Sequence, residues 1–132
     1  MGGGRLATNL FDYSKAKQYE PYHDMSVNKF KELEYRVKLK DAYLTLQMSS
    51  ENYGGEGAFL VCGIIERNGE PLELRDFPRQ TIDTHGGGKG LFVERGYFEE
   101  KVYLRREWIV HTPIKSEVGD IITLKHFQLY KL

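Results

Sequence analysis

Apolar and polar residues alternate along most of the chain from residue 33 onward. In the stretch LEYRVKL, four apolar residues from Leu33 to Leu39 alternate with three charged residues. Because successive side chains of a strand point to opposite faces of a sheet, this pattern predicts a strand with one buried face. The alternation resumes at Ala42 with its phase shifted by one residue, which predicts a turn or a bulge near Asp41.

A second kind of pattern appears in the segment GAFLVCGII at 57–65, which is almost continuously apolar. This run is too short for a typical helix and rich in β-forming residues, so it predicts a central strand that is buried on both faces. The dipeptide Asn68-Gly69 follows and predicts a tight hairpin, because both positions of a type I′ turn need a positive φ. Pro71 marks the returning arm as an edge strand or a strand start.

The C-terminal third of the chain returns to alternation. Residues 97–104 and 107–111 predict two further strands. In the last strand, 121–132, the apolar phase changes partway along. A bulge near Lys125-His126 would direct the apolar side chains on both sides of it into one core.

Two parts of the chain lack this regularity. Residues 76–90 gather proline, aspartate and glycine without a period, and we predict a long loop there. Residues 24–33 predict one helical turn capped by Asp24 or Ser26. Residues 9–24 are rich in aromatic and turn-forming residues, and we expect them to lie extended against the sheets.

These patterns together predict an all-β fold. Seven to eight short strands are expected, without the alternation of strands and helices that parallel α/β folds require. We therefore expect an antiparallel β-sandwich or barrel. The length of 132 residues suits one domain, and we expect residues 9–132 to form it after a flexible segment at 1–8.

Composition argues against several classes of function. The 19 Lys and Arg residues balance the 19 Asp and Glu residues, so no overall positive field favours nucleic acid as a partner. No apolar run reaches the roughly 18 to 20 residues of a membrane span, and no secretory signal is evident, so we expect a product made in the cytoplasm that contacts no membrane. Cys62, the single cysteine, excludes an intramolecular disulfide and is interpreted as a buried thiol.

The glycine-rich stretch THGGGKG at 84–90 resembles two catalytic motifs in part. A P-loop needs a glycine where Asp83 stands and a serine or threonine where Gly90 stands. The letters HGGG match the oxyanion motif of lipases, but no serine lies in the G-x-S-x-G elbow that this motif serves. We interpret the stretch as a mobile glycine loop that contacts a partner, if it has a function, through residues such as His85 and Lys89.

Residues that could bind a metal ion are scattered. Asp83 and His85 share one phase of a strand, and two further histidines, His111 and His126, lie on or near late strands, but no clustered ligand motif is present. We therefore predict no transition-metal site and no cofactor, and leave open a structural calcium ion. The adjacent glutamates at 99–100 would point to opposite faces of a strand, so they cannot act as the acid and base of a glycosidase.

Aromatic residues are abundant, with nine Tyr, seven Phe and one Trp. Flat aromatic rings on a surface are suitable platforms for sugars. Trp108 falls in the apolar phase and is expected in the core. Tyr53, within SSENYGGEG, and Tyr97, after Gly96, are expected to be exposed and are the platform candidates. The alternative for each is a half-exposed tyrosine that covers the edge of a sandwich.

Several phrases of the sequence, in their order, resemble a known family. Over residues 9–132, these phrases are similar to the carbohydrate-binding-module-like, galactose-binding-type β-sandwich of bacteriophage tail and baseplate proteins: NLFDYSKA, YRVKLKDAYLTLQM, ERNGEP, GYFEEKVYLRREWIVHTP and GDIITLKHFQLYKL. The resemblance implies a jelly-roll sandwich without catalytic activity. It also implies a location in the virion, in contact with host-surface glycans or as a structural appendage.

Three functional hypotheses remain. The first is a non-enzymatic virion protein of a tail, baseplate or capsid that acts through contacts with other virion proteins, with binding of a cell-surface glycan and homo-oligomerisation left open. The second is a stand-alone carbohydrate-binding module, and the third is a small metal-dependent or hydrolytic enzyme. In the first, the loops at 51–57 and 76–97 face outward or toward a partner, and in the second, Tyr53 and Tyr97 contact the glycan. The candidate contact residues are Tyr53, Arg79, His85, Lys89 and Tyr97.

Overall fold

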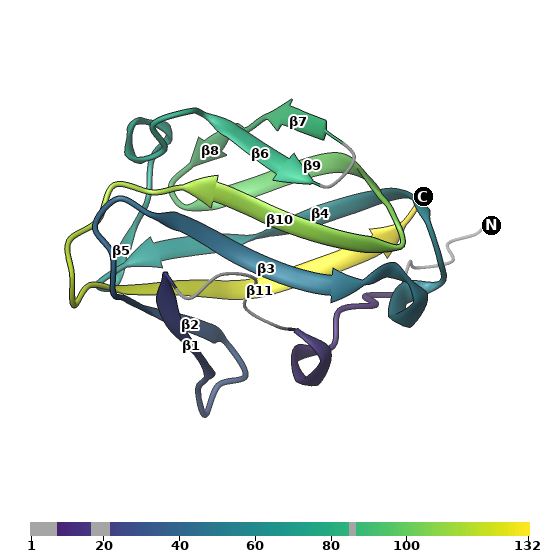
Figure 1. Cartoon of the computed structure of the whole chain (residues 1–132), viewed down its shortest axis with the longest axis horizontal. Coiled ribbons are helices and arrows are strands. Elements are labelled where there is room, and N and C mark those ends of the chain that lie inside the picture. The colour runs from purple at the N-terminus through teal and green to yellow at the C-terminus, as the bar shows by residue number, and fades with distance from the viewer. Residues whose placement is uncertain (1–7, 17–21, 85–86) are drawn as a thin grey trace.

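The computed structural model describes residues 8–16, 22–84 and 87–132, except for the side chains of residues 48, 83–84, 87–89 and 107–111. These residues form two antiparallel β-sheets and three short 3₁₀ turns, and none of them forms a helix long and apolar enough to span a membrane (Figure 1). The elements are η1 (Tyr13–Lys15), β1 (His23–Val27), β2 (Leu33–Val37), β3 (Tyr43–Ser49), η2 (Ser50–Tyr53), β4 (Gly57–Arg67), β5 (Glu70–Pro71), η3 (Leu74–Asp76), β6 (Thr81–Thr84), β7 (Gly87–Gly90), β8 (Val93–Glu94), β9 (Tyr97–Leu104), β10 (Glu107–Pro113) and β11 (Ile121–Lys131).

The strand pairs are nested in the sequence, as they would be if the chain were folded into one long hairpin. β2 pairs with β11, β3 with β10, β4 with β9, and β6 with β7, each antiparallel. Successive pairs alternate between the two sheets, whose strand orders are β1-β2-β11-β4-β9-β8, with β5 paired to β4, and β3-β10-β6-β7. In Figure 1 the strands β3, β10 and β6 lie in front of β11, β4 and β9. The predicted all-β, antiparallel class is therefore confirmed.

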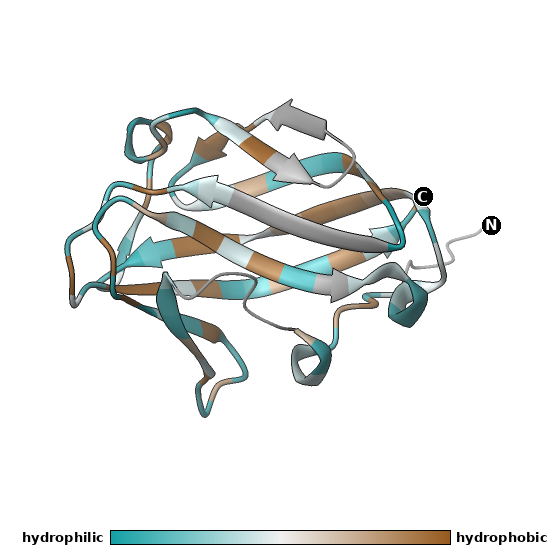
Figure 2. Cartoon of the chain, in the orientation of Figure 1, coloured by the Kyte–Doolittle hydropathy of each residue, from teal (hydrophilic) through white to brown (hydrophobic). Residues whose placement is uncertain are grey.

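Both sheets contribute side chains to a shared hydrophobic core. On β2, Leu33, Tyr35 and Val37 are at most 1% exposed, and the charged residues between them face outward. The resulting alternation of hydrophobic and hydrophilic residues is visible along the strands in Figure 2. The predicted half-buried strand is confirmed, but it ends at Val37, so Leu39 does not share the buried face and is 53% exposed.

β4 is the central strand of the first sheet, as its apolar sequence predicts. It lies between β11 and β9 and directs Phe59, Val61 and Ile65 into the core. On its outer face Cys62 is only 6% exposed, which confirms the buried thiol, but Leu60 and Ile64 are half-buried. The outer face of this strand is therefore only partly covered.

Two turns have the predicted backbone conformations. Asn68 and Gly69 have φ values of 52° and 83°, the positive values that a type I′ turn requires, and Pro71 lies on the short returning strand β5. Asp41 has a φ of 55°, at the position where the apolar phase shifts by one residue. Both turn predictions are confirmed.

The predicted bulge in the last strand is also confirmed. The pairing of β11 with β4 changes register between Lys125 and Gln128, and His126 has a φ of 50°. The extra residue re-aims the strand, so that Leu124 before the bulge and Phe127 within it are both at most 3% exposed.

The prediction of a continuous loop at 76–90 is wrong. β6 pairs with β7, and it also pairs with β10, which places the glycine-rich segment Gly87–Gly90 on a sheet. Backbone groups form the hydrogen-bonded ladder whatever the side chain, and a run of glycines has no apolar alternation that would indicate a strand.

The prediction of a helical turn at 24–33 is also wrong, because β1 and β2 form a hairpin. The turn is built around Asn28, whose Oδ1 accepts hydrogen bonds from the backbone N–H groups of Phe30 (2.9 Å) and Glu32 (3.0 Å). Asparagine favours such turns over helices because its side chain replaces a backbone partner. Pairing with β2 then outweighs the local helical preference.

Residues 9–11 lie extended beside the C-terminal half of β11, as expected for the segment before the first strand. The Leu10 N–H donates to the Leu129 carbonyl (2.8 Å), and Asn9 Oδ1 accepts from the Leu129 N–H (3.0 Å). Phe11 packs edge-to-face against Phe127 with ring centroids 4.6 Å apart. The start of the described chain is thus anchored to the core.

Candidate functional site

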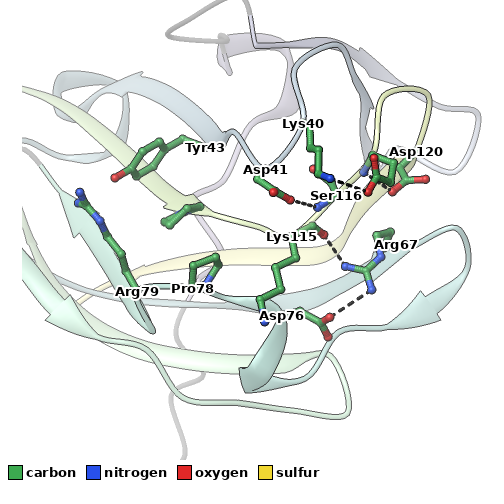
Figure 3. A pocket seen from close by; sticks show the side chains of 12 residues that line it. Lys40, Asp41, Tyr43, Arg67, Asp76, Pro78, Arg79, Lys115, Ser116 and Asp120 are labelled. Carbon is green, nitrogen blue, oxygen red and sulfur yellow. Dashed lines mark hydrogen bonds and ion pairs between the residues drawn. The ribbon is translucent and has the colours of Figure 1, made fainter.

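Three connections meet at one end of the molecule (Figure 1), and a groove of about 780 Å³ lies among them (Figure 3). The connections are the β2–β3 turn, the segment from the end of β4 through η3 to β6, and the β10–β11 loop. Its volume falls within the range of ligand pockets, roughly 300 to 1,000 Å³. We call it the loop groove. It is lined by Lys40, Asp41, Tyr43, Arg67, Asp76, Pro78, Arg79, Pro113, Lys115, Ser116, Glu117 and Asp120.

An ion pair within the β4–β6 connection and two hydrogen bonds from it to the β10–β11 loop stabilise one wall of the loop groove. Arg67 Nη2 lies 3.1 Å from Asp76 Oδ1, and Arg67 Nη1 donates to the Lys115 carbonyl. The Lys115 N–H in turn donates to the Asp76 carbonyl (2.9 Å). Because the Arg67 and Asp76 side chains are only 29% and 14% exposed, solvent and salt screen this pair less than a surface pair.

The β2–β3 turn is tied to the β10–β11 loop by a reciprocal pair of hydrogen bonds. Asp41 Oδ1 accepts from the Ser116 N–H (2.9 Å), and the Asp41 N–H donates to the Ser116 carbonyl (3.2 Å). Lys40 Nζ lies 3.2 Å from Glu117 Oε1, and this carboxylate raises the pKa of Lys40. The walls of the groove are therefore held at several points.

Asp120 stabilises the β10–β11 loop and joins it to the β4–β5 turn. Its carboxylate accepts from the Glu117 N–H (2.9 Å) and from the Asn68 side-chain amide (3.0 Å). These two hydrogen bonds, the backbone one first, hold the pKa of Asp120 below its ordinary value. The Asp120 carboxylate is thus ionised at neutral pH, and it accepts hydrogen bonds from other groups of the protein.

Two cations of the groove differ from the others. The Arg79 guanidinium lies over the Tyr43 ring, 5.5 Å from its centroid, and the Lys115 side chain is exposed. Within the described part of the chain, neither side chain forms a hydrogen bond or an ion pair. Their charges are directed to the groove and to solvent.

A second surface lies on the outer face of the first sheet. Tyr97 and Tyr103 on β9 point outward, as does Tyr130 on β11, because their strand neighbours Phe98, Val102 and Leu129 fill the core. On β4 between them, Ile64 pairs with Tyr97, and Leu60 pairs with Tyr130. The tyrosine face comprises Tyr97, Tyr103, Tyr130, Leu60 and Ile64.

Polar groups accompany these rings. The Tyr97 hydroxyl donates to Glu99 Oε1 (3.3 Å), and the Tyr130 hydroxyl donates to Gln128 Oε1. Tyr97 and Tyr103 are 49% and 56% exposed. They are six residues apart on one strand, which corresponds to a span of roughly 20 Å. The tyrosine face is an open, amphipathic surface with hydrogen-bonding groups beside its rings.

Cys62 lies in the middle of the tyrosine face, opposite Glu99 on one neighbouring strand and Gln128 on the other. Burial, followed by the nearby Glu99 carboxylate, raises the pKa of the Cys62 thiol. A thiol with a raised pKa is a poor nucleophile at neutral pH, because the thiolate is the reactive form. Cys62 is therefore suited to packing.

The exposure predicted for Tyr53 is wrong. The residues Ser50–Tyr53 form the 3₁₀ turn η2, which directs the ring into the core, where it is only 1% exposed. Burial, the main cause, raises the pKa of Tyr53 to about 12. Tyr53 therefore cannot act as a surface platform. The sequence around it has no alternation of apolar and polar residues, so it did not indicate that a 3₁₀ turn would bury the ring.

The other predicted contact residues fall in three places. Tyr97 is exposed, as predicted, and belongs to the tyrosine face, whereas Arg79 lines the loop groove. Lys89 lies on β7, and its side chain is outside the described set, as are the side chain of Trp108 and the whole of His85. The structure does not unite Arg79 and Tyr97 in one site.

Sequence reasoning did not name Tyr43, Tyr103 or Tyr130 among the candidate contact residues. A signal for Tyr103 was present, since it shares the outward phase of YFEEKVYL with Tyr97. Tyr130 takes the outward phase only once the bulge is counted. Among the side chains that the structure describes, no three or more His, Cys, Asp or Glu groups are arranged to hold a metal ion.

Comparisons with protein-family models, with curated proteins and with solved structures find no match to this chain.

Proposed function

We propose that the chain is a non-enzymatic jelly-roll protein of a bacteriophage virion and that its tyrosine face binds a glycan of the host surface. The tyrosine face is the observation that carries this proposal. The virion setting comes from the resemblance of the sequence phrases to tail and baseplate modules.

The strand order supports the jelly-roll part of the proposal. Without the marginal strands β1, β5 and β8, eight strands remain, and they pair first with eighth, second with seventh, third with sixth and fourth with fifth. A jelly roll is a long hairpin of this kind wrapped into two sheets, and viral capsid and lectin domains use it. The fold alone is compatible with many functions, so the function rests on the site.

The chemistry of the tyrosine face suits sugar rings. A pyranose presents C–H groups on its flat faces and hydroxyl groups at its rim. Tyrosine rings supply flat apolar area with little conformational entropy to lose, and Leu60 and Ile64 extend that area between them. The Glu99 carboxylate and the Gln128 amide lie beside the rings, where they can bind the rim hydroxyls.

The state of the candidate catalytic groups supports a non-enzymatic role. The four groove carboxylates bind groups of the protein itself, and the Cys62 thiol has a raised pKa. General acids, bases and nucleophiles need accessible groups whose pKa is tuned toward the working pH. These groups serve the structure instead.

A glycan array with fluorescently labelled protein tests the proposal. We expect hits whose signal falls about tenfold or more in Tyr97→Ala and in Tyr130→Ala, since central aromatic residues carry much of a contact's free energy. Phe30→Ala is the matched control, because Phe30 is 69% exposed at the tip of the β1–β2 hairpin, away from the tyrosine face. An array without hits, or hits that survive both tyrosine substitutions, would contradict the glycan contact.

The virion part has a separate test. We expect the purified protein to bind phage particles that lack its gene, and negative-stain images of those particles to show a missing tail, baseplate or capsid feature. Unchanged particles that do not bind the protein would remove the virion assignment and leave a stand-alone carbohydrate-binding module.

A further inference from the structure

We propose that the loop groove binds an acidic peptide segment of a neighbouring protein and that Arg79 and Lys115 hold its carboxylates. The proposal concerns a different surface and a different class of ligand from the glycan contact. It rests on the charges, the walls and the rigidity of the groove.

The carboxylates that line the groove already have partners. Asp76 pairs with Arg67, Glu117 pairs with Lys40, and Asp41 and Asp120 accept backbone and amide N–H groups. Lys40 and Arg67 also interact electrostatically with Asp41 and Asp120, respectively. The four cations and four carboxylates of the lining balance in formal charge. The carboxylates are nevertheless engaged within the protein, whereas the Arg79 and Lys115 side chains form no hydrogen bond or ion pair with the described residues, so these two cations are the groups with which an anionic ligand can form new ion pairs.

Arg79 is positioned to bind a carboxylate. Its guanidinium lies over the Tyr43 ring, which restrains the long side chain. The N–H donors of a guanidinium lie in its plane, and a carboxylate can accept two of them at once.

The walls between the two cations favour a peptide over a small anion. Pro78 lies between Arg79 and Lys115 in Figure 3, and the rings of Tyr43 and Pro113 add further apolar surface. Grooves lined by aromatic rings bind extended, proline-rich peptides, and the side chains of such a peptide can reach cations on both sides. A phosphate ion would fill only a small part of 780 Å³.

The groove is also preorganised. The β4–β6 connection is joined to the β10–β11 loop by the hydrogen bonds that Arg67 and Asp76 form with Lys115, and that loop is joined to the β2–β3 turn by the reciprocal Asp41–Ser116 hydrogen bonds. A site that is already ordered loses less entropy when a ligand binds. The geometry therefore favours a ligand that fits the existing walls.

The experiment is a titration of the isotopically labelled full chain, followed by amide NMR. The probe is the blocked tetrapeptide Glu-Pro-Pro-Glu, and the matched control is blocked Gln-Pro-Pro-Gln. We expect the acidic peptide to cause saturable shifts at the amides of Tyr43, Arg79 and Lys115, and the neutral peptide to cause none at the same concentration. Shifts that are absent, or equal for the two peptides, would overturn the proposal.

Variants separate the groove from general charge attraction. Arg79→Gln and Lys115→Gln should each weaken the acidic peptide at least about fivefold. Arg105→Gln should not, because Arg105 is exposed in the β9–β10 turn, at the other end of β10 from the groove. Spectra that are unchanged away from the groove will show that the variants fold. Unaltered affinity in both groove variants would overturn the assignment.

Titrations with inorganic phosphate and with glucuronate test whether the groove prefers a small anion or an acidic sugar. We expect both to bind more weakly than the acidic peptide, because each presents one anionic group whereas the peptide presents two. Tighter binding of either one would overturn the peptide assignment and indicate a small anion or an acidic sugar. Tyr97→Ala should leave peptide binding unchanged whatever its effect on glycans.

Discussion

At the scale of single residues, two buried polar side chains on β1 and β2 influence stability. Tyr35 is fully buried, and its hydroxyl has no hydrogen-bond partner among the described residues. Its ring meets the His23 ring edge-to-face, with centroids 6.2 Å apart, and His23 is only 2% exposed. Burying a polar group without full compensation costs free energy.

Replacement of Tyr35 by phenylalanine is predicted to stabilise the protein. Tyr35→Phe removes a buried, unpaired hydroxyl and keeps the ring, so the free energy of unfolding should rise by about 1 kcal/mol. Tyr53→Phe is the matched control. The Tyr53 hydroxyl lies 3.5 Å from the Asp12 carbonyl, so its removal should bring no gain. Urea unfolding measures both, and a less stable Tyr35→Phe would contradict the prediction.

His23 is predicted to make stability depend on pH. Burial lowers the pKa of His23 below its ordinary value of 6.5. The unfolded chain therefore binds a proton more readily, and the stability that the neutral ring contributes is full above pH 6.5 and declines as the pH falls below it. Urea midpoints at pH 7.5, 6.5 and 5.5 should show this decline, and His23→Phe should flatten it. An equal slope in the variant would show that other groups are responsible.

At the scale of elements, the β8–β9 turn depends on Gly96. Its φ is +80°, and an added Cβ would lie 2.9 Å from the Ile65 carbonyl oxygen. Gly96→Ala should therefore lower the free energy of unfolding by roughly 1 to 3 kcal/mol, through backbone strain and steric overlap. Gly90→Ala is the control, because nothing lies within 4 Å of its added Cβ. Thermal unfolding compares the two, and equal melting temperatures would count against this account.

Elements with regular side-chain patterns could be predicted from the sequence, and the others could not. β2 and the bulged β11 were predictable because a buried face selects apolar residues at every second position. β7 was not, because its glycines carry no such pattern, and β1 was not, because its partner strand decides its conformation. Pairing across the sheet is absent from local sequence.

The candidate sites were predictable only in part. Tyr97 was recognisable from its outward phase after Gly96, whereas the burial of Tyr53 depends on a 3₁₀ turn without a periodic signal. The loop groove was not predictable, because it joins segments around residues 41, 79 and 116 that meet only through the nested strand pairs.

At the scale of the whole molecule, the nested pairing separates two surfaces. It brings three connections together at one end, which forms the loop groove, and it places β4 between β9 and β11, which forms the tyrosine face. A rigid two-sheet core can thus present a charged end and an aromatic side at once. In our account, the first binds a neighbouring protein and the second binds a glycan.

The most direct measurement of the central claim is amide NMR of the labelled chain with the strongest glycan from the array. The account predicts saturable shifts on the outward positions of β9, β4 and β11, around Tyr97, Tyr103 and Tyr130, with the loop groove unchanged. Shifts confined to the loop groove, or no saturable shift on the tyrosine face with any arrayed glycan, would contradict the claim.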